Sequence, residues 1–324
     1  MARVLVTGSS GFLGSYVIKL LVERGDEVTA LDVRMPSGEQ AWLLKDSLKS
    51  VNFFKGTVED LSTILRTIRH NRVEMVVHAA SVVDPEYLLH NPLVAYRVNL
   101  GGTLNVLEAA RLEGLSRVVY LSTNGIFVSK KYEPIDEDHP VISANQGPGN
   151  GPYSASKLSS EAFGLSYASA FGFKFISLRP SAIYGFGMQY PMFIKPMVEN
   201  AVRGLPTRFD SGRNLPRDYT HVLDVSQAVY QALHVQKPAD SIFLVATGND
   251  LVTPGQLMEI IKEKLPGSDI QVGEGLSEWN QREVKYRGRI SIRRAKEQLG
   301  YEPQHDIEAG VMEYINTYKQ FLGL

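Results

Sequence analysis

The sequence predicts an α/β fold, in which a doubly wound parallel sheet (Rossmann) is joined to a smaller, irregular C-terminal substrate lobe. Strand-like apolar runs alternate with helical periodicities through residues 1–180. Such alternation is typical of parallel strands connected by right-handed helical crossovers. Prolines from Pro180 to Pro254 then break the rhythm into short pieces. We therefore expect residues 1–180, with a returning strand near 241–246, to form one domain, and residues 181–324 to form mainly a second lobe.

Each expected element follows from local periodicity. Short apolar runs predict strands, and apolar residues recurring every three or four positions predict helices. The predicted strands are residues 4–6, 27–32, 51–54, 73–78, 117–122, 173–178 and 241–246, and the predicted helices are residues 12–21, 59–70, 91–112 and 153–171. Ligands of such sheets lie beyond the carboxyl ends of the strands. Residues just after a strand should therefore converge on one edge: Gly8, Asp32, Ala79, Thr123 and Tyr184.

A glycine-rich turn joins the first predicted strand to the first predicted helix, with glycines at positions 8, 11 and 14. This geometry aims backbone N–H groups and a helix N-terminus at a pyrophosphate, and glycine lets the ligand approach closely. The spacing differs from the commoner Gly-x-Gly-x-x-Gly, and the alternative is a turn that merely needs glycine. The expected cofactor-binding residues here are Gly8, Ser10, Gly11, Phe12, Leu13 and Gly14.

An acid at the end of the second predicted strand, Asp32, favours NAD as the cofactor. A carboxylate there can bind the ribose hydroxyls of NAD and repels the 2′-phosphate of NADP. Arg34 is the opposing observation, because an arginine can accompany a 2′-phosphate. A turn residue at a strand end is the alternative role of Asp32.

Tyr153 and Lys157 are the expected catalytic pair. Residues four apart share one helix face, so the phenol and the ammonium can address the same small volume. A nearby cation lowers the pKa of a phenol, which otherwise titrates near pH ~10. The tyrosine would then serve as a general acid and base. Alone, the spacing also fits an ordinary half-exposed helix face; the upstream glycine turn favours catalysis.

Composition narrows the class of protein. The chain has 324 residues, is 44% hydrophobic and 21% charged, and carries a formal net charge of −1, so nucleic acid and anionic membranes are not expected partners. It contains no cysteine, which excludes disulfides, thiolate catalysis and cysteine metal sites, and we expect no metal. The absence of long apolar runs and of room for a signal peptide predicts a cytoplasmic protein without a membrane span.

Taken together, the motifs resemble the extended short-chain dehydrogenase/reductase superfamily, in its NAD-dependent epimerase/dehydratase branch, of which UDP-glucose 4-epimerase is the best-known member. The resemblance spans nearly the whole chain. Beyond the glycine turn, Asp32, Tyr153 and Lys157, it rests on His78-Ala79-Ala80, Asn99, Ser122-Thr123, Leu178-Arg179-Pro180 with Tyr184-Gly185, residues 217–222 and Leu299-Gly300-Tyr301-Glu302-Pro303.

The resemblance implies roles for these residues. Tyr153 would exchange a proton with a substrate hydroxyl while hydride passes between that carbon and the nicotinamide. Lys157 would bind the nicotinamide ribose, and Thr123 would hydrogen-bond the same substrate oxygen. The resemblance adds Val58, Ala79, Ala80, Asn99 and Pro180 to the cofactor-binding residues, although a buried helix amide is an equal alternative for Asn99.

The chain departs from the family pattern at three positions. Thr57 stands where many members have an acid for adenine, which leaves the backbone near Val58, and Phe127 replaces a common tyrosine. Ala182 replaces the asparagine that holds a nucleotide-sugar diphosphate. Against this, the family uses an arginine at position 217 on that diphosphate, and Arg287 is a candidate second clamp; solvated surface charge is the alternative for both. The expected substrate-binding residues are Ser81, Thr123, Asn124, Arg217 and Arg287.

Three functions remain open from the sequence. The first is an NAD-dependent epimerase of a sugar or nucleotide sugar, similar to a 4-epimerase. The second is an NAD-dependent dehydrogenase or reductase of a sugar acid or other secondary alcohol, favoured by Ala182 and the apolar stretch after Ser81. The third is a catalytically silent NAD-binding protein. A dehydratase is the weakest fit, because Asn124-Gly125 replace the Asp-Glu pair of such enzymes. The helices at 91–112 and 153–170 carry apolar residues on more than one face, which predicts a homodimer; the alternative is that they only cover the sheet.

Overall fold

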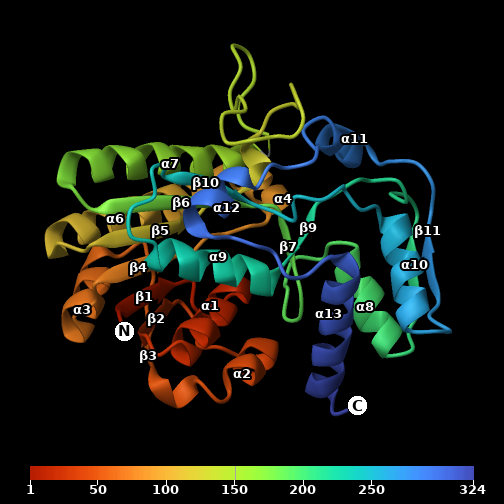
Figure 1. The fold of residues 1–324 in the computed structure, drawn as a ribbon, viewed down its shortest axis with the longest axis horizontal. Helices are drawn as coiled ribbons and strands as arrows, with labels where there is room; N and C mark the ends of the chain where they lie inside the picture. The colour runs from red at the N-terminus through yellow and green to blue at the C-terminus, as the bar shows by residue number, and fades with distance from the viewer. Residues whose placement is uncertain (150) are drawn as a thin grey trace.

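The computed structural model describes residues 1–149 and 151–324. Its centre is a seven-stranded sheet of order β10-β6-β5-β4-β1-β2-β3, in which every pairing is parallel (Figure 1). The strands are β1 (Arg3–Thr7), β2 (Glu27–Asp32), β3 (Val51–Lys55), β4 (Met75–His78), β5 (Arg117–Leu121), β6 (Lys174–Pro180) and β10 (Ile242–Val245). The predicted doubly wound parallel sheet is confirmed.

Helices cover both faces of this sheet, and each face has its own core. Neighbouring residues of β1 point to opposite sides, as the period of a strand requires: Val4 and Val6 pack in one core and Leu5 in the other. The first core is closed by α1 (Phe12–Glu23), α9 (Val222–His234) and α12 (Arg293–Leu299). The second is closed by α3 (Leu61–Asn71), α6 (Gly102–Glu113) and α7 (Gly151–Phe171).

The helix expected at residues 91–112 is divided. It consists of α5 (Pro92–Val94), the π-helical segment η2 (Ala95–Gly101) and α6. A Cβ at Gly102 would lie 2.5 Å from Cγ2 of Val58, so the glycine permits close approach to that loop. Two short helices, α2 (Gly38–Leu44) and α4 (Pro85–His90), lie outside the predicted elements, because segments of seven and six residues offer too few apolar repeats to predict.

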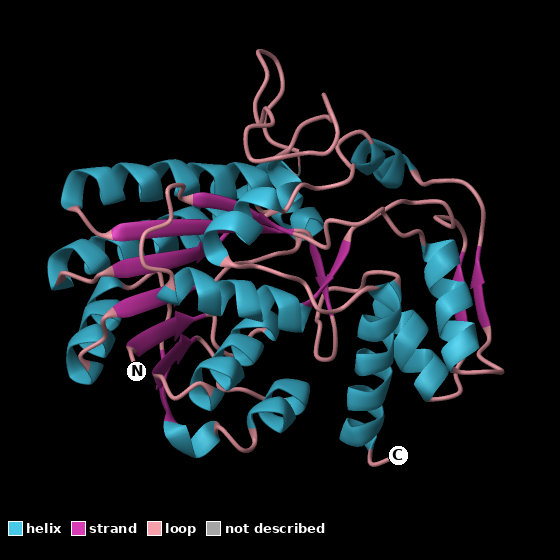
Figure 2. Cartoon of the chain, viewed as in Figure 1, coloured by secondary structure: helices cyan, strands magenta, loops and turns pink. Residues whose placement is uncertain are grey.

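The C-terminal lobe lies beside the sheet and has a separate core (Figure 2). Two small parallel sheets pair β7 (Ala182–Tyr184) with β9 (Tyr219–His221) and β8 (Thr207–Phe209) with β11 (Ile270–Val272). They pack with α8 (Ile194–Val202), α10 (Pro254–Lys264) and α13 (Ile307–Leu322), while the short helix α11 (Glu278–Val284) lies at the rim. Among the described residues, no helix has the length and apolar character needed to cross a bilayer.

Tyr184 is not at the ligand edge of the main sheet, where the sequence placed it. β6 continues to Pro180, and the chain then enters β7, whose partner is β9 rather than a strand of the large sheet. The ring of Tyr184 is fully buried in the lobe core, 5.1 Å from the ring of His221. The expectation was wrong because the apolar run after Pro180 belongs to a second, smaller sheet.

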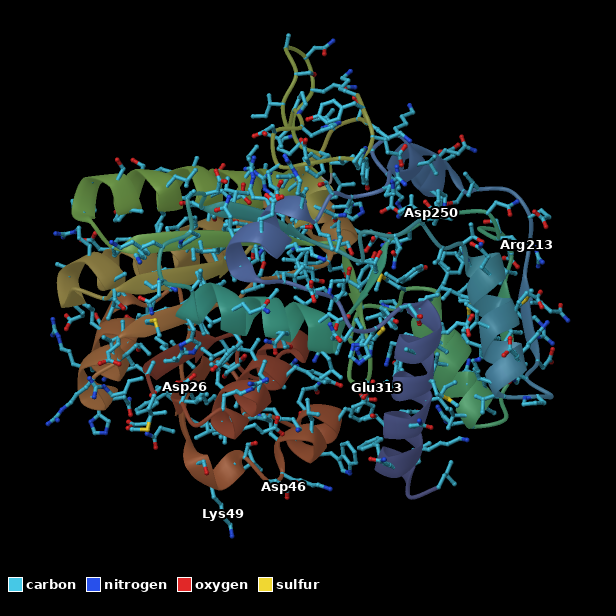
Figure 3. The ribbon with its side chains drawn as sticks, viewed as in Figure 1. Asp26, Asp46, Lys49, Arg213, Asp250 and Glu313 are labelled. Atoms are coloured by element: carbon cyan, nitrogen blue, oxygen red, sulfur yellow. The ribbon has the colours of Figure 1, made fainter. Side chains whose placement is uncertain are left out.

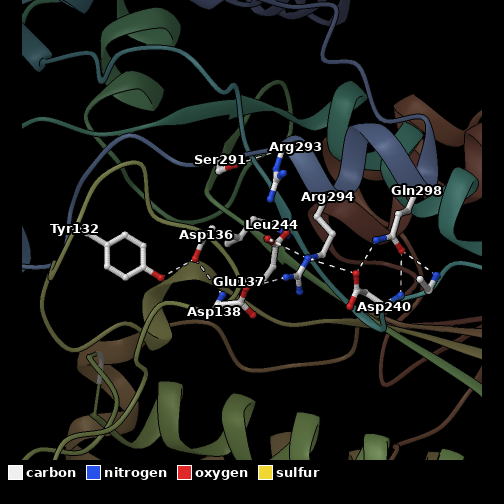
Figure 4. Close-up of polar contacts among 11 residues, drawn as sticks. Tyr132, Asp136, Glu137, Asp138, Asp240, Leu244, Ser291, Arg293, Arg294 and Gln298 are labelled. Atoms are coloured by element: carbon white, nitrogen blue, oxygen red, sulfur yellow. Dashed lines mark hydrogen bonds and ion pairs between the residues drawn. The ribbon is translucent and has the colours of Figure 1, made fainter.

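The loop that precedes α7 is fastened to the outer edge of the main sheet. Glu137 accepts a hydrogen bond from the backbone N–H of Leu244 in the edge strand β10 at 2.8 Å, and Arg294 of α12 pairs with Asp138 at 3.0 Å (Figure 4). Farther along the loop, Ile135 exchanges backbone hydrogen bonds with Arg289 and Ser291. These bonds bring the loop against the segment that carries Arg287.

Candidate active site

The glycine turn is held tightly against the end of β4. Gly8 has φ +70°, and a Cβ there would lie 2.6 Å from the backbone nitrogen of Ala80. A Cβ at Gly14 would lie 2.2 Å from the carbonyl oxygen of Gly8. Any larger residue would therefore push the turn away from the sheet and close the space above it. The turn forms a cradle of backbone suited to a pyrophosphate.

Asp32 lies at the end of β2 beside this turn. Its carboxylate accepts hydrogen bonds from the backbone N–H of Ser10 at 3.0 Å and of Arg34 at 3.2 Å. The Ser10 hydroxyl donates to the carbonyl oxygen of Arg34 at 2.8 Å, which ties the two loops together. The carboxylate is thus positioned at the sheet edge, where it can meet a ribose diol.

A cavity of about 290 Å³ opens above the carboxyl ends of the strands. It brings together most of the residues predicted to bind cofactor and substrate, although they come from separate loops. Its lining includes Gly8, Gly11, Phe12, Leu13, Gly14, Ala79, Ser81, Thr123, Tyr153, Lys157 and Pro180. This lining fits a dinucleotide. The glycine turn, Tyr153 and Lys157 line the cavity, and Asp32 lies next to the turn.

Tyr153 and Lys157 share one face of α7, with Thr123 opposite them at the end of β5. The side chains of Tyr153 and Thr123 both line the cavity. Lys157 donates from Nζ to the carbonyl oxygen of Leu121 at 2.7 Å. Its Nζ lies 5.9 Å from the ring centre of Tyr153 and 5.0 Å from that of Tyr120.

Burial dominates the protonation of this pair. Desolvation raises the pKa of Tyr153 to about 12, although the neighbouring Thr123 side chain opposes the shift. Desolvation lowers the pKa of Lys157 to about 7, and the carboxylate of Glu161 opposes that shift. The ammonium of Lys157 is directed to the Leu121 carbonyl, so its effect on the phenol stays a prediction.

A second cavity, of about 140 Å³, adjoins the first and shares Thr123 and Ser181 with it. It contains the predicted substrate residues Asn124, Arg217 and Arg287. The side chain of Arg217 is 21% exposed and that of Arg287 is 9% exposed. Their alternative role as solvated surface charge therefore does not describe this structure. The two arginines form a cationic end to a continuous cleft.

Five predicted cofactor residues do not line the larger cavity. Ser10 belongs to the glycine turn and donates its backbone N–H to Asp32, and the backbone of Ala80 packs against Gly8. Val58 is buried, and its carbonyl oxygen accepts a hydrogen bond from Asn105 at 2.9 Å. The amide of Asn99 is engaged by both backbone groups of Val82 and by the Ser156 hydroxyl. Asn99 thus has the contacts of the buried helix amide that was its alternative role.

Several cavity residues were not predicted, and most of them lie after residue 180. The larger cavity is also lined by Ser181, Met188, Gln189, Tyr190 and Met192, and the smaller one by Asp218, Glu283 and Tyr286. The Ser181 hydroxyl donates to the carboxylate of Asp218 at 2.5 Å. Only Asp218 belongs to a recognisable motif, so the sequence carried no signal for the others.

Comparison with known proteins identifies the family. A family model described as the NAD dependent epimerase/dehydratase family matches residues 4–246. The chain belongs to this family. The predicted resemblance is confirmed, as is NAD as the cofactor on which the family depends. The protein is therefore an enzyme of a family that contains both epimerases and dehydratases.

Relatives of nearly equal length carry names from both classes. A putative UDP-glucose 4-epimerase of Methanocaldococcus jannaschii is 28% identical over 326 residues, which cover 98% of each chain. A dTDP-glucose 4,6-dehydratase of Streptomyces antibioticus is also 28% identical, over 98% of this chain and 92% of its own. The solved UDP-glucose 4-epimerase of Thermus thermophilus in complex with NAD is 27% identical, with a TM-score of 0.80 over 98% of this chain and 99% of its own.

Proposed function

We propose that this enzyme is an NAD-dependent epimerase of a sugar or nucleotide sugar, acting like a 4-epimerase. The observation that carries the proposal is the convergence of Thr123, Tyr153 and Lys157 on a cavity floored by the glycine turn, with two arginines at its far end. Residues 1–180 with β10 would hold NAD, and residues 181–324 would mainly hold the substrate.

The protein groups would act on one secondary alcohol of the substrate. The Tyr153 phenol would take the proton of that hydroxyl, and Thr123, which lines the same cavity, would orient the same oxygen. Lys157 would hold a ribose hydroxyl, and its ammonium would favour the phenolate when charged. NAD, when bound, supplies the hydride acceptor and donor, and its positive nicotinamide favours the phenolate further. Epimerisation follows if the oxidised sugar turns its other face before hydride returns.

The arginines favour a substrate that carries a diphosphate. A guanidinium offers a planar fork of donors that matches phosphate oxygens, and Arg217 and Arg287 present two such forks in one small cavity. Ala182 also lines this cavity and has no polar side chain to offer. The arginines would then take over the contact that the family's asparagine makes.

A net dehydrogenase or reductase is the second candidate. The observation that favours it is the apolar wall of the larger cavity, where Val83, Ile183 and Met192 face the space beside Ser81. Such a wall suits a substrate with less polar surface than a sugar. In this case NAD would be consumed rather than regenerated.

One experiment separates these functions. Purified enzyme is denatured and the supernatant is assayed for NAD; separately, it is incubated with UDP-sugars, dTDP-glucose, free sugars and sugar acids. An epimerase should convert a nucleotide sugar to its epimer without net NADH absorbance. Steady NADH formation would instead support the dehydrogenase, and a 4-keto-6-deoxy product would identify a dehydratase. No turnover with any substrate of the panel would count against the epimerase.

We also propose that the enzyme is a homodimer formed through η2, α6 and α7. Large apolar side chains remain exposed along these helices and the adjoining α5: Leu93 at 71%, Tyr96 at 61%, Phe163 at 44% and Phe171 at 52%. A second copy of the chain would cover this face, as the family resemblance implies. Sedimentation equilibrium should give twice the chain mass of 36.0 kDa, and a monomer at micromolar concentration would contradict the proposal.

A further inference from the structure

A carboxylate lies between the two arginines of the smaller cavity. Arg217 donates from Nη2 to Oε2 of Glu283 at 3.1 Å, and Nη2 of Arg287 forms an ion pair with the same oxygen. The Glu283 side chain is only 14% exposed. One acidic oxygen is therefore shared by two largely buried cations.

Glu283 balances a charge repulsion within the cavity. Burial, and next the charge of Arg217, lower the pKa of Arg287 to about 10, and Glu283 opposes this shift. Burial and the Glu283 carboxylate both raise the pKa of Tyr286, which lines the same cavity. Charges in a partly desolvated site interact more strongly than charges in water. Without Glu283, the two guanidinium groups would face each other with no counter-charge between them.

The arginines are anchored more directly than the acid. The backbone N–H and carbonyl of Arg217 both bond to Val252, at 3.0 and 2.9 Å, and Nη1 of Arg287 donates to the carbonyl oxygen of Pro216 at 2.9 Å. Glu283 lies near the end of α11, a short helix at the rim of the molecule, and Arg287 follows it in the connection between α11 and α12 (Figure 1). Rotation of the Glu283 side chain alone would release both forks while their own anchors stay in place.

We infer that Glu283 is an internal ligand of the clamp formed by Arg217 and Arg287, and that the diphosphate of the substrate must displace it. Carboxylate and phosphate oxygens compete for the same guanidinium N–H groups. A diphosphate has enough oxygens to bond each arginine separately, whereas Glu283 offers both the same one. Glu283 thereby sets the affinity of the site. The inference rests on the proposed function for the class of ligand.

Calorimetric titration with UDP tests the inference by comparing the wild type with Glu283→Gln. Glutamine keeps the size of the side chain but removes its charge, so UDP should bind about 10-fold more tightly, because a charge-assisted contact no longer has to be broken. The melting temperature of the ligand-free variant should fall, since the arginines lose their counter-charge. A merely structural glutamate would weaken both stability and binding.

Glu278→Gln is the matched control. Glu278 is an exposed acid on the same helix, so the change in net charge is identical but no arginine is released. Its UDP affinity should stay within about 2-fold of the wild type, as for other exposed charges. An equal gain in both variants would show a general charge effect and overturn the inference.

The remaining outcomes separate this inference from the proposed function. Unchanged or weaker UDP binding by Glu283→Gln overturns the inference. If UDP does not bind, the same comparison is made with inorganic pyrophosphate, and failure of both probes to bind overturns the clamp and the inference together. Tighter UDP binding by Glu283→Gln, without conversion of any nucleotide sugar by the wild type, would overturn the epimerase and leave the role of Glu283 standing.

Discussion

Replacing Tyr153 by phenylalanine should remove proton transfer while leaving the cavity intact. The ring is 8% exposed and stacks against its neighbours with or without the hydroxyl, so the fold should persist. What is lost is the phenol that lines the cavity with Thr123 and shares the helix face of Lys157. Positioned acid–base groups contribute ~10²- to 10⁴-fold in rate.

The structure favours the lower end of this range. Thr123 remains to hold the substrate oxygen, and Lys157 keeps its hydrogen bond to the Leu121 carbonyl, since neither contact depends on the Tyr153 hydroxyl. We therefore expect turnover to fall by ~100-fold, which corresponds to a barrier higher by about 2.7 kcal/mol. NAD affinity should change little, because the substitution removes only the phenol hydroxyl and leaves the glycine turn and Asp32 unchanged.

The assay is single-turnover conversion of the active nucleotide sugar, with NAD binding followed by fluorescence. Tyr190→Phe is the matched control, since Tyr190 is a second tyrosine of the same cavity and is 41% exposed. That variant should keep most of its activity. Near-normal turnover by Tyr153→Phe would refute the reasoning. A severe loss confined to Tyr190→Phe would show that Tyr190, and not Tyr153, transfers the proton.

Three further outcomes are expected. Asp32→Ala should weaken NAD binding ~10-fold or more and relax discrimination against NADP, because a charged acceptor for the ribose is lost; an unchanged NAD/NADP ratio in a binding titration would remove Asp32 from the ribose site. Glu161→Gln should lower the free energy of unfolding in urea by ~3–5 kcal/mol, because it leaves the Arg179 guanidinium, 4% exposed, without its carboxylate; a loss below ~1 kcal/mol would show that water compensates the buried cation. Stability should also fall as pH rises above 6.5, because the hydrogen bond to Asp224 raises the folded-state pKa of His305 above that value. His305→Gln should flatten the dependence of the melting temperature on pH above 6.5, and an unchanged slope would exclude this pair as its cause.

The location of His305 and Asp224 explains why that pH effect should concern the contact between the lobes. Asp224 lies in the first turn of α9, which packs on the main sheet, whereas His305 precedes α13 of the C-terminal lobe. Within that lobe, Glu313 of α13, labelled in Figure 3, lies 3.1 Å from Nε2 of His221 at the end of β9. Protonated His305 therefore favours the docked lobes, and the deprotonated ring gives up part of that contact.

The sequence by itself determined the parts of this enzyme whose chemistry lies within short stretches of chain. The glycine turn, Asp32 and the Tyr153–Lys157 spacing each depend on one strand–turn junction or one helix face, so local periodicity was enough to place them. The alternation of strands and helices likewise sufficed to predict the parallel sheet, because the crossovers between parallel strands are right-handed and this leaves few other topologies.

Only the tertiary structure decided which distant residues meet. Arg217 and Glu283 are separated by 66 positions yet share a hydrogen bond, and no periodicity connects them. The prediction for Tyr184 was wrong because its strand, β7, pairs with β9 in a separate small sheet. The Asn99 amide is buried because it forms hydrogen bonds with Val82 and Ser156. Side chains of irregular segments are positioned by packing between elements, and that information is spread over the whole chain rather than held in any one motif.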